Sequence, residues 1–219
     1  MRGGLSRLAT AARPQSQERQ ITCADFPALY GDEVAQLYIA LIHHPVLDRR
    51  GKTVTSAITS LDIHDLARAA RTYGAGGVFV VHPVGEQRDF AARLLDHWRL
   101  GHGREFDSRR REALELIRVV AELDDAIAAI ADSTGTRPVV VYTSARAQDG
   151  VSFAELRQRL AAPGAAPILI LLGTGFGMAP GVKDRADLVL APIRGPDDYN
   201  HLSVRSAASI ILDRLRGTQ

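Results

Sequence analysis

Short apolar runs recur along the chain from Leu37 onward. They cover residues 37–42, 77–81, 116–121, 138–142, 168–172 and 188–190. The runs are rich in Val, Ile and Leu and are bounded by Gly, Pro or polar residues. This pattern is typical of parallel strands that are covered on both faces. We therefore predict six buried strands.

The segments between these runs have helical spacing. Residues 62–73 begin with an acidic side chain, place Ile63, Leu66 and Ala70 on one face, and end before Gly74. Similar patterns predict helices over residues 87–100, 123–133, 153–160 and 201–216. Strands that alternate with helices predict an α/β fold, with a mostly parallel six-stranded sheet and helices on both faces.

Composition narrows the class of protein. The 219 residues are 46% hydrophobic and 24% charged, which is ordinary for a globular protein. The single cysteine, Cys23, excludes an intramolecular disulfide and a cysteine-based zinc site, and we predict no metal site. No apolar run reaches the roughly 20 residues that span a bilayer, so we expect no membrane association.

The first 33 residues differ from the rest of the chain. They are rich in arginine, have no periodic apolar face, and contain no acidic residue before Glu18. This composition favours a flexible N-terminal extension, residues 1–33, in front of one domain over residues 34–219. An organelle transit peptide is the alternative, because such peptides are also arginine-rich and poor in acids.

Polar and glycine-rich segments follow the last three predicted strands. In open α/β sheets, ligands bind beyond the carboxyl ends of the strands. The segments that follow these strands are residues 142–145, 173–177 and 191–195. We therefore expect a ligand site where the three segments meet.

The middle segment carries the glycines Gly173, Gly175 and Gly177. Glycine permits positive φ and lets a backbone approach a flat ligand such as adenine. The GxGxG spacing does not match the GxGxxG dinucleotide fingerprint, and too few elements follow it to build a mononucleotide-binding half. This disfavours a Rossmann protein of metabolism, and a simple turn remains the alternative.

Residues 191–209 crowd polar side chains at the start of the last predicted helix. A helix N-terminus has unpaired N–H groups and a partial positive charge, which suit an anionic or carboxylate-bearing ligand. Alternatively, Asn200 caps the helix, Ser203 and Ser206 pack against a neighbour, and His201 is a hydrogen-bonded structural histidine.

These loops and the final helix resemble the SPOUT superfamily of RNA methyltransferases, and most closely a TrmD-related bacterial family of stand-alone proteins. The resemblance covers residues 36–217. It is carried by His44-Pro45-Val46, residues 59–73, Trp98, Gly173-Thr174-Gly175, Pro192-Ile193 and residues 198–203. The general-base loop and the C-terminal RNA-binding domain of TrmD itself have no clear match, so the target nucleotide does not follow from the resemblance.

The resemblance implies a C-terminal trefoil knot, a homodimer, and S-adenosylmethionine as the cofactor, held mainly by backbone groups of the three loops. The residues that it implies for cofactor binding are Thr143, Ser144, Ala145, Gly173, Thr174, Gly175, Ala191, Pro192, Ile193, Gly195, Tyr199, Asn200, His201, Leu202 and Ser203.

The leading hypothesis is a cytoplasmic enzyme that methylates a nucleotide in structured RNA, with tRNA favoured over rRNA. Asp198 and His201 are the candidate proton acceptors, and Arg205 or Arg194 stabilises charge on the nucleotide. The alternative is a non-catalytic RNA-binding or ribosome-assembly module that keeps the knotted fold.

Two basic clusters are candidates for RNA contact. Arg49, Arg50 and Lys52 follow the first predicted strand and are the preferred platform, while residues 109–111 are the second candidate. Phosphates attract such clusters regardless of base sequence. The net charge of +2 gives no further support, so solvated surface arginines remain the alternative for each cluster.

Overall fold

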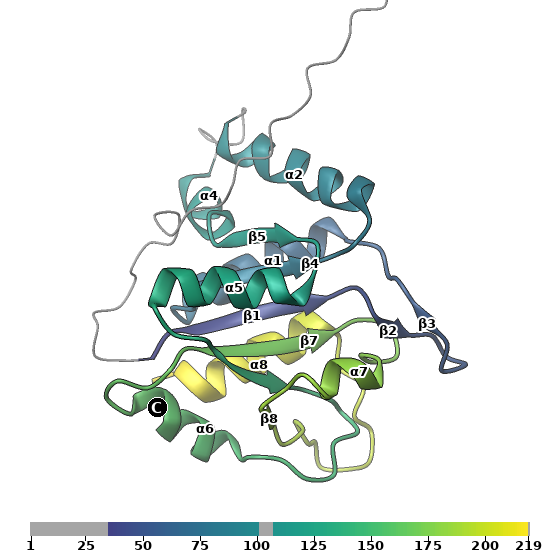
Figure 1. Cartoon of the computed structure of the whole chain (residues 1–219), viewed down its shortest axis with the longest axis vertical. Helices are drawn as coiled ribbons and strands as arrows, with labels where there is room; N and C mark the ends of the chain where they lie inside the picture. The colour runs from purple at the N-terminus through teal and green to yellow at the C-terminus, as the bar shows by residue number, and fades with distance from the viewer. Residues whose placement is uncertain (1–34, 101–106, 219) are drawn as a thin grey trace, which may run out of the picture.

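A six-stranded sheet forms the centre of the molecule (Figure 1). The computed structural model describes residues 35–100 and 107–218, so the predicted N-terminal extension lies outside the described residues. All strand pairs in this sheet are parallel, and the order is β5-β4-β1-β7-β6-β8. The strands are β1 (Leu37–Ile42), β4 (Gly77–Val81), β5 (Ile117–Val120), β6 (Val139–Tyr142), β7 (Ile168–Gly173) and β8 (Leu188–Val189).

Burial on both faces explains why these strands are continuous apolar runs. Every residue of β1 is buried. Leu37, Ile39 and Leu41 point into one hydrophobic cluster, and Tyr38 and Ala40 point into the other, because successive side chains of a strand alternate between faces. The prediction of a parallel sheet covered on both faces is therefore confirmed.

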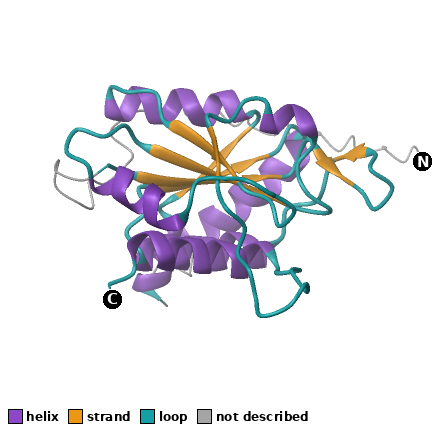
Figure 2. Cartoon of the chain, turned by 90° about the horizontal axis from the view of Figure 1, so that it is seen from below, coloured by secondary structure: helices purple, strands orange, loops and turns teal. Residues whose placement is uncertain are grey.

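Helices form a layer on each side of the sheet (Figure 2). One layer contains α5 (Leu123–Thr134) and α7 (Pro180–Lys183). The other contains α1 (Ser60–Thr72), α2 (Gly85–Arg99), α4 (Ser108–Leu114), α6 (Phe153–Ala161) and α8 (Val204–Arg216). Within this layer α8 packs against both α1 and α6.

The last helix begins three residues later than predicted. We predicted a helix over residues 201–216, whereas α8 begins at Val204. Ser203 has extended backbone angles and its side chain accepts a hydrogen bond from the Ser206 N–H, so Ser203 is the N-cap. The segment from Asn200 to Leu202 is consequently free to line a cavity.

Four short elements within residues 35–100 and 107–218 were not predicted. β2 (Val46–Leu47) and β3 (Thr53–Val54) form an antiparallel hairpin, and α4 and α7 are additional helices. The trefoil knot implied by the resemblance stays a prediction. None of the described helices is long and apolar enough to cross a membrane.

Candidate active site

A cavity of about 750 Å³ lies beyond the carboxyl ends of β6, β7 and β8. Its walls come from the loops that follow these three strands, from the segment before α8, and from the start of α1. The volume falls within the range of small-molecule and cofactor sites. The structure therefore brings together three loops that are far apart in the sequence, at the predicted edge of the sheet.

Most of the predicted site residues line this cavity. They are Thr143, Ser144, Ala145, Gly173, Thr174, Gly175, Ala191, Pro192, Ile193, Asp198, Asn200, His201, Leu202 and Ser203. Four others lie outside its lining: Arg194, Gly195, Tyr199 and Arg205. Tyr199 is 75% exposed, and Arg194 and Gly195 are also exposed.

Hydrogen bonds connect the loop after β6 to its neighbours. The Thr143 hydroxyl donates to the Leu171 carbonyl of β7 at 2.7 Å. The Asn200 side-chain amide donates to the Ala145 carbonyl at 3.2 Å, so Asn200 joins the first and third loops and does not cap α8. These contacts hold two walls of the cavity together.

The glycine loop packs against the β2–β3 hairpin. A Cβ on Gly173 would lie 2.6 Å from Met178 Cγ, and a Cβ on Gly175, whose φ is +61°, would lie 2.9 Å from the Leu47 carbonyl oxygen. The Phe176 N–H donates to the same Leu47 carbonyl at 3.0 Å. These two glycines are therefore required by the fold of the loop itself, and not only by the approach of a ligand as the sequence suggested.

One wall of the cavity was not predicted from the sequence. Ala57, Thr59 and Asp62, at or just before the start of α1, line the cavity together with residues of α8 that include Ala207. In the sequence, Thr59 and Asp62 indicate only a helix N-cap, which they also form. Their place in the site depends on the packing of α1 against α8, which no local pattern reveals.

Arg205 holds the carboxylates of α1. Its Nε lies 3.5 Å from Asp62 Oδ1, and its Nη1 donates to Asp65 Oδ2 at 3.1 Å. Arg205 is thus engaged in two intramolecular ion pairs, and its predicted contact with the nucleotide stays a prediction. Arg205 is half-buried, and the Asp62 side chain is only 13% exposed.

A series of hydrogen-bonded side chains leads from the buried His43 to the wall of the cavity. His43 Nδ1 lies 2.9 Å from the Ser56 hydroxyl, which also forms a short hydrogen bond with the Thr174 hydroxyl of the glycine loop. Burial, and to a smaller extent the positive charge of neighbouring His82, lowers the pKa of His43 to about 4. His43 is therefore a neutral imidazole at physiological pH.

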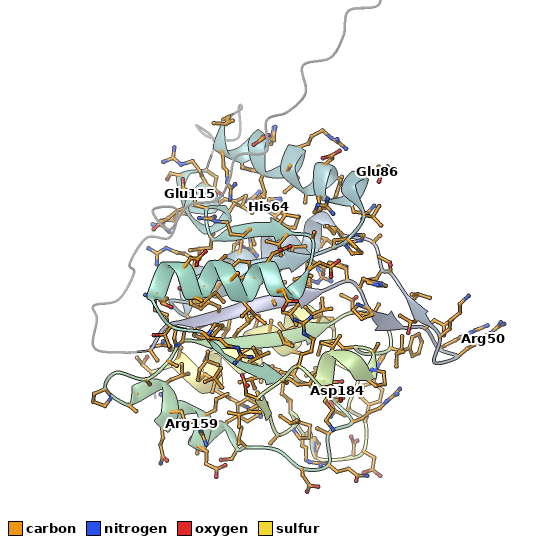
Figure 3. The ribbon with its side chains drawn as sticks, viewed as in Figure 1. Arg50, His64, Glu86, Glu115, Arg159 and Asp184 are labelled. Atoms are coloured by element: carbon orange, nitrogen blue, oxygen red, sulfur yellow. The ribbon has the colours of Figure 1, made fainter. Side chains whose placement is uncertain are left out.

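The preferred basic cluster lies on the β2–β3 hairpin. Arg49, Arg50 and Lys52 are exposed, and Figure 3 shows Arg50 pointing away from the body of the molecule. The Asp48 carboxylate accepts hydrogen bonds from the Arg50 and Lys52 backbone N–H groups and shapes the turn. Because Leu47 bonds to the glycine loop, the cluster lies at the same sheet edge as the cavity.

Two of the three arginines of the second basic cluster make intramolecular contacts. The Arg110 guanidinium stacks over the Trp98 ring at 4.8 Å and lies 3.4 Å from Asp107. Arg111 lies 3.8 Å from Glu115. The hairpin is therefore the better candidate for an RNA contact.

Curated relatives resemble the chain over most of its length. It is 44% identical over 181 residues to a tRNA (guanine-N(1)-)-methyltransferase of Oleidesulfovibrio alaskensis, which covers 83% of this chain and 42% of the relative. A protein of the same name from Nitratidesulfovibrio vulgaris is 42% identical, over 96% of this chain and 50% of the relative. The chain thus spans about half the length of the curated relatives it matches.

The fold also resembles that of solved methyltransferase structures. A TrmH/SpoU tRNA modifying enzyme of Aquifex aeolicus superposes with a TM-score of 0.51 at 15% identity, covering 84% of this chain and 76% of that one. The profile of a family described as SAM-dependent RNA methyltransferase matches residues 36–217. This match includes all three cavity loops, α1 and α8, and the chain therefore belongs to the SAM-dependent RNA methyltransferase family.

Proposed function

We propose that this protein transfers a methyl group from S-adenosylmethionine to a nucleotide in structured RNA, with tRNA as the preferred class. The observation that carries the proposal is the cavity formed by the three strand-end loops in a chain of this family. The tRNA activity named for the two curated relatives supports the substrate class. Because tRNA and the cofactor occur in the cytoplasm, the protein is proposed to act there. It is also proposed to act as a homodimer, as the family resemblance implies.

The residues of the cavity fit the cofactor. Apolar side chains suited to an adenine ring lie beside hydroxyl, amide and backbone groups suited to the ribose and the amino acid moiety. The apolar group includes Leu190, Ile193 and Ile211, and the polar group includes Thr143 and Asn200. When bound, S-adenosylmethionine supplies an electrophilic methyl group on a positively charged sulfur.

The chain's own contribution is proposed to be positioning and proton transfer. Orientation of two bound reactants removes much of the entropic barrier, so the loops that line the cavity should dominate the rate enhancement. Asp198 and His201 line the cavity and remain available as polar contacts to the nucleotide. Arg194 and Tyr199, which lie outside the lining, are better placed to contact RNA beyond it.

A binding titration tests the proposal. S-adenosylmethionine and S-adenosylhomocysteine should bind the purified protein, whereas NAD and ATP should not. Ala207→Leu adds apolar bulk to the α8 wall and should weaken cofactor binding at least tenfold, while Ala92→Leu on the exposed side of α2 should not. Binding of NAD or ATP in place of the methyl donor would contradict the proposal.

A non-catalytic RNA-binding module is the second candidate. It is favoured by the length of the curated relatives, since half or more of each lies beyond the matched region and can carry the activity in their names. Mapping RNA methylation in a deletion strain separates the two. Loss of one methylated nucleotide, restored by the parent gene and not by Ala207→Leu, supports the enzyme. An unchanged map together with RNA binding supports the module.

A further inference from the structure

The glycine loop, residues 173–177, carries its only polar side chain between two glycines. Thr174 lies between Gly173 and Gly175, and the φ of Gly175 is +61°. Glycine gives a backbone many more conformations than other residues do, so a loop of this composition needs contacts that select one of them. The backbone hydrogen bond from the Thr174 N–H to the Ile42 carbonyl is long, at 3.4 Å. The Thr174 side chain is therefore well placed to fix this part of the loop.

A series of hydrogen bonds with one direction leads to the Thr174 hydroxyl. This hydroxyl donates to the Ile42 carbonyl at 3.2 Å and forms a short hydrogen bond with the Ser56 hydroxyl. The Ser56 hydroxyl in turn lies 2.9 Å from His43 Nδ1. Each hydroxyl has one proton to donate. All three bonds can form at once only if His43 Nδ1–H donates to Ser56, Ser56 donates to Thr174, and Thr174 donates to the carbonyl.

The first two members of this series are held by the ends of β1 and β4, which lie side by side in the sheet (Figure 1). The burial of His43 is the main cause of its low pKa of about 4, so the ring is neutral at physiological pH and has a single N–H. The Ser56 N–H donates to the His43 carbonyl at 3.0 Å. His82 Nε2 donates to the Ser56 carbonyl at 3.0 Å, because His82 Nδ1 is occupied as the acceptor of the Val84 N–H. Ser56 is thus fixed on both sides of its peptide.

We propose that His43 and Ser56 are positioning residues for S-adenosylmethionine, which act by holding Thr174 and with it the glycine loop in the shape that binds the cofactor. This inference rests on the proposed function. Thr174 lines the cavity, whereas His43 and Ser56 lie outside its lining. A loop that is fixed before binding loses less conformational entropy when the ligand arrives, which increases affinity.

The inference also assigns a role to the Thr174 hydroxyl. Its proton is engaged by the Ile42 carbonyl, and its oxygen accepts from Ser56. Thr174 therefore serves the ligand through the backbone of the loop, and its hydroxyl is an anchor for that backbone. A direct contact between this hydroxyl and the cofactor is the competing role, and the two roles predict different results when Ser56 and Thr174 are changed together.

A double-mutant cycle distinguishes the two roles. Ser56→Ala and Thr174→Val should each weaken S-adenosylmethionine binding roughly tenfold in calorimetry, the scale of one lost buried hydrogen bond. The double variant should bind about as tightly as either single variant, because both changes break the same series. If the losses add to roughly 100-fold, the two side chains act independently and the inference is wrong.

Conservative variants and a matched control test the same point. Thr174→Ser keeps the hydroxyl and should bind S-adenosylmethionine nearly as well as the parent. His43→Asn places an amide N–H near the position of Nδ1 and should keep most of the affinity, whereas His43→Leu has no donor and should match Ser56→Ala. The Thr55 hydroxyl is exposed and bonds to His44 Nδ1 at 3.0 Å, so Thr55→Ala should bind like the parent. Equal affinity in Ser56→Ala and the parent would overturn the inference.

Hydrogen exchange of the ligand-free protein tests the loop without the cofactor. The Phe176 N–H donates to the Leu47 carbonyl at 3.0 Å, and the Gly177 N–H donates to the Thr174 carbonyl at 3.2 Å, so both amides report on the shape of the loop. In Ser56→Ala they should exchange roughly tenfold faster than in the parent, while the amides of α5 keep their rates.

The outcomes of this measurement are separate from those of the binding experiments. Unchanged exchange in the loop, or an equal increase in the loop and in α5, would overturn the inference, because the series would then have no local effect on the loop. A parent protein that binds no S-adenosylmethionine would instead contradict the proposed function, and the exchange rates would still decide whether Ser56 holds the loop.

Discussion

His43 couples the end of β1 to the glycine loop through Ser56 and Thr174. The imidazole is buried, and its Nε2 has no hydrogen-bond partner among the described residues. A protonated ring would be a charge without compensation in this position, because the neighbouring His82 can only add repulsion. The neutral form of His43 is therefore part of what keeps the loop in place.

This burial makes stability depend on pH. The pKa of His43 is about 4 in the folded protein, whereas an unperturbed histidine, as in the unfolded chain, has a pKa of 6.5. The unfolded chain thus binds an extra proton between these values, and stability present above pH 6.5 is lost as the pH falls toward 4. The linked free energy is at most roughly 3 kcal/mol.

Urea unfolding at pH 7.5 and pH 4.5 measures this effect. The free energy of unfolding should fall less between the two pH values in His43→Gln than in the parent. The exposed His97 provides the matched control, and His97→Gln should keep the full pH dependence. An identical decrease in the parent and His43→Gln would show that His43 does not cause it.

Gly175 is the second residue with a measurable role. Its positive φ and the nearby Leu47 carbonyl mean that any side chain strains the loop that lines the cavity. Gly175→Ala should therefore destabilise the protein by about 1–2 kcal/mol and weaken S-adenosylmethionine binding at the same time. Calorimetry and thermal unfolding measure the two effects.

Gly181 supplies the control for this substitution. A Cβ there meets no atom within 4 Å and its φ is not positive, so Gly181→Ala should change neither quantity. Weaker cofactor binding in Gly175→Ala without any loss of stability would assign this glycine to the ligand alone, as the sequence first suggested.

Among the helices and strands, the β2–β3 hairpin is the element with the clearest predicted role in RNA binding. Its turn presents Arg49 and Arg50 to solvent beside the cavity loops. Arg49→Ala/Arg50→Ala should weaken RNA binding and reduce the magnitude of the salt dependence of log K by roughly one to two, because each lost phosphate contact removes about one released counterion. Cofactor affinity should be unaffected.

Filter binding at several salt concentrations makes the comparison. Arg93→Ala/Arg159→Ala removes the same charge from exposed positions of α2 and α6, and Figure 3 shows Arg159 on a different part of the surface from Arg50. This control should retain the salt slope of the parent. If both double variants behave alike, the hairpin is not the RNA platform, and residues 109–111 become the next candidate.

Elements could be predicted where their pattern is local. The longer strands were located within a residue or two because runs of four or more mostly apolar residues mark them without reference to the rest of the chain. The hairpin strands and α7 have two to four residues each, too few for a period to show. The start of α8 was misplaced because two serines and an asparagine compete as caps, and only the tertiary contact of Asn200 with Ala145 decides between them.

At the scale of the whole molecule, the sequence predicts that strands and helices alternate, but it does not predict the order of the strands in the sheet. The pairing of β1 with β7 joins residues more than 120 positions apart, such as Leu37 and Ile168, and long-range pairing leaves no local mark. For the same reason the sequence did not reveal Asp62 as a cavity residue, because its place in the cavity depends on the packing of α1 against α8. The three strand-end loops of the site follow from the rule that ligands bind at strand ends, whereas the wall at the start of α1 required the structure.

The structure changes the physical reason for expecting a homodimer. The small side chains of Ser206, Ala207 and Ala208 in the sequence would permit close approach of a second subunit. In the structure Ala208 is buried within its own protomer and Ala207 lines the cavity, so these two residues are not available for contact with a second subunit. Exposed apolar side chains also occur in the segment before α8, where Tyr199 is 75% exposed and Leu202, which lines the cavity mouth, is 44% exposed.

We therefore predict a dimer whose interface includes this mouth. Light scattering at micromolar concentration should give about twice the chain mass of 23.7 kDa. Tyr199→Asp/Leu202→Asp should shift the protein toward the monomer, because a charge buried without a partner opposes association. Phe90→Asp, at an exposed apolar position of α2, should leave the dimer intact. A parent protein that scatters as a monomer would mean that the cavity is complete within one chain, and that its exposed apolar rim serves the RNA alone.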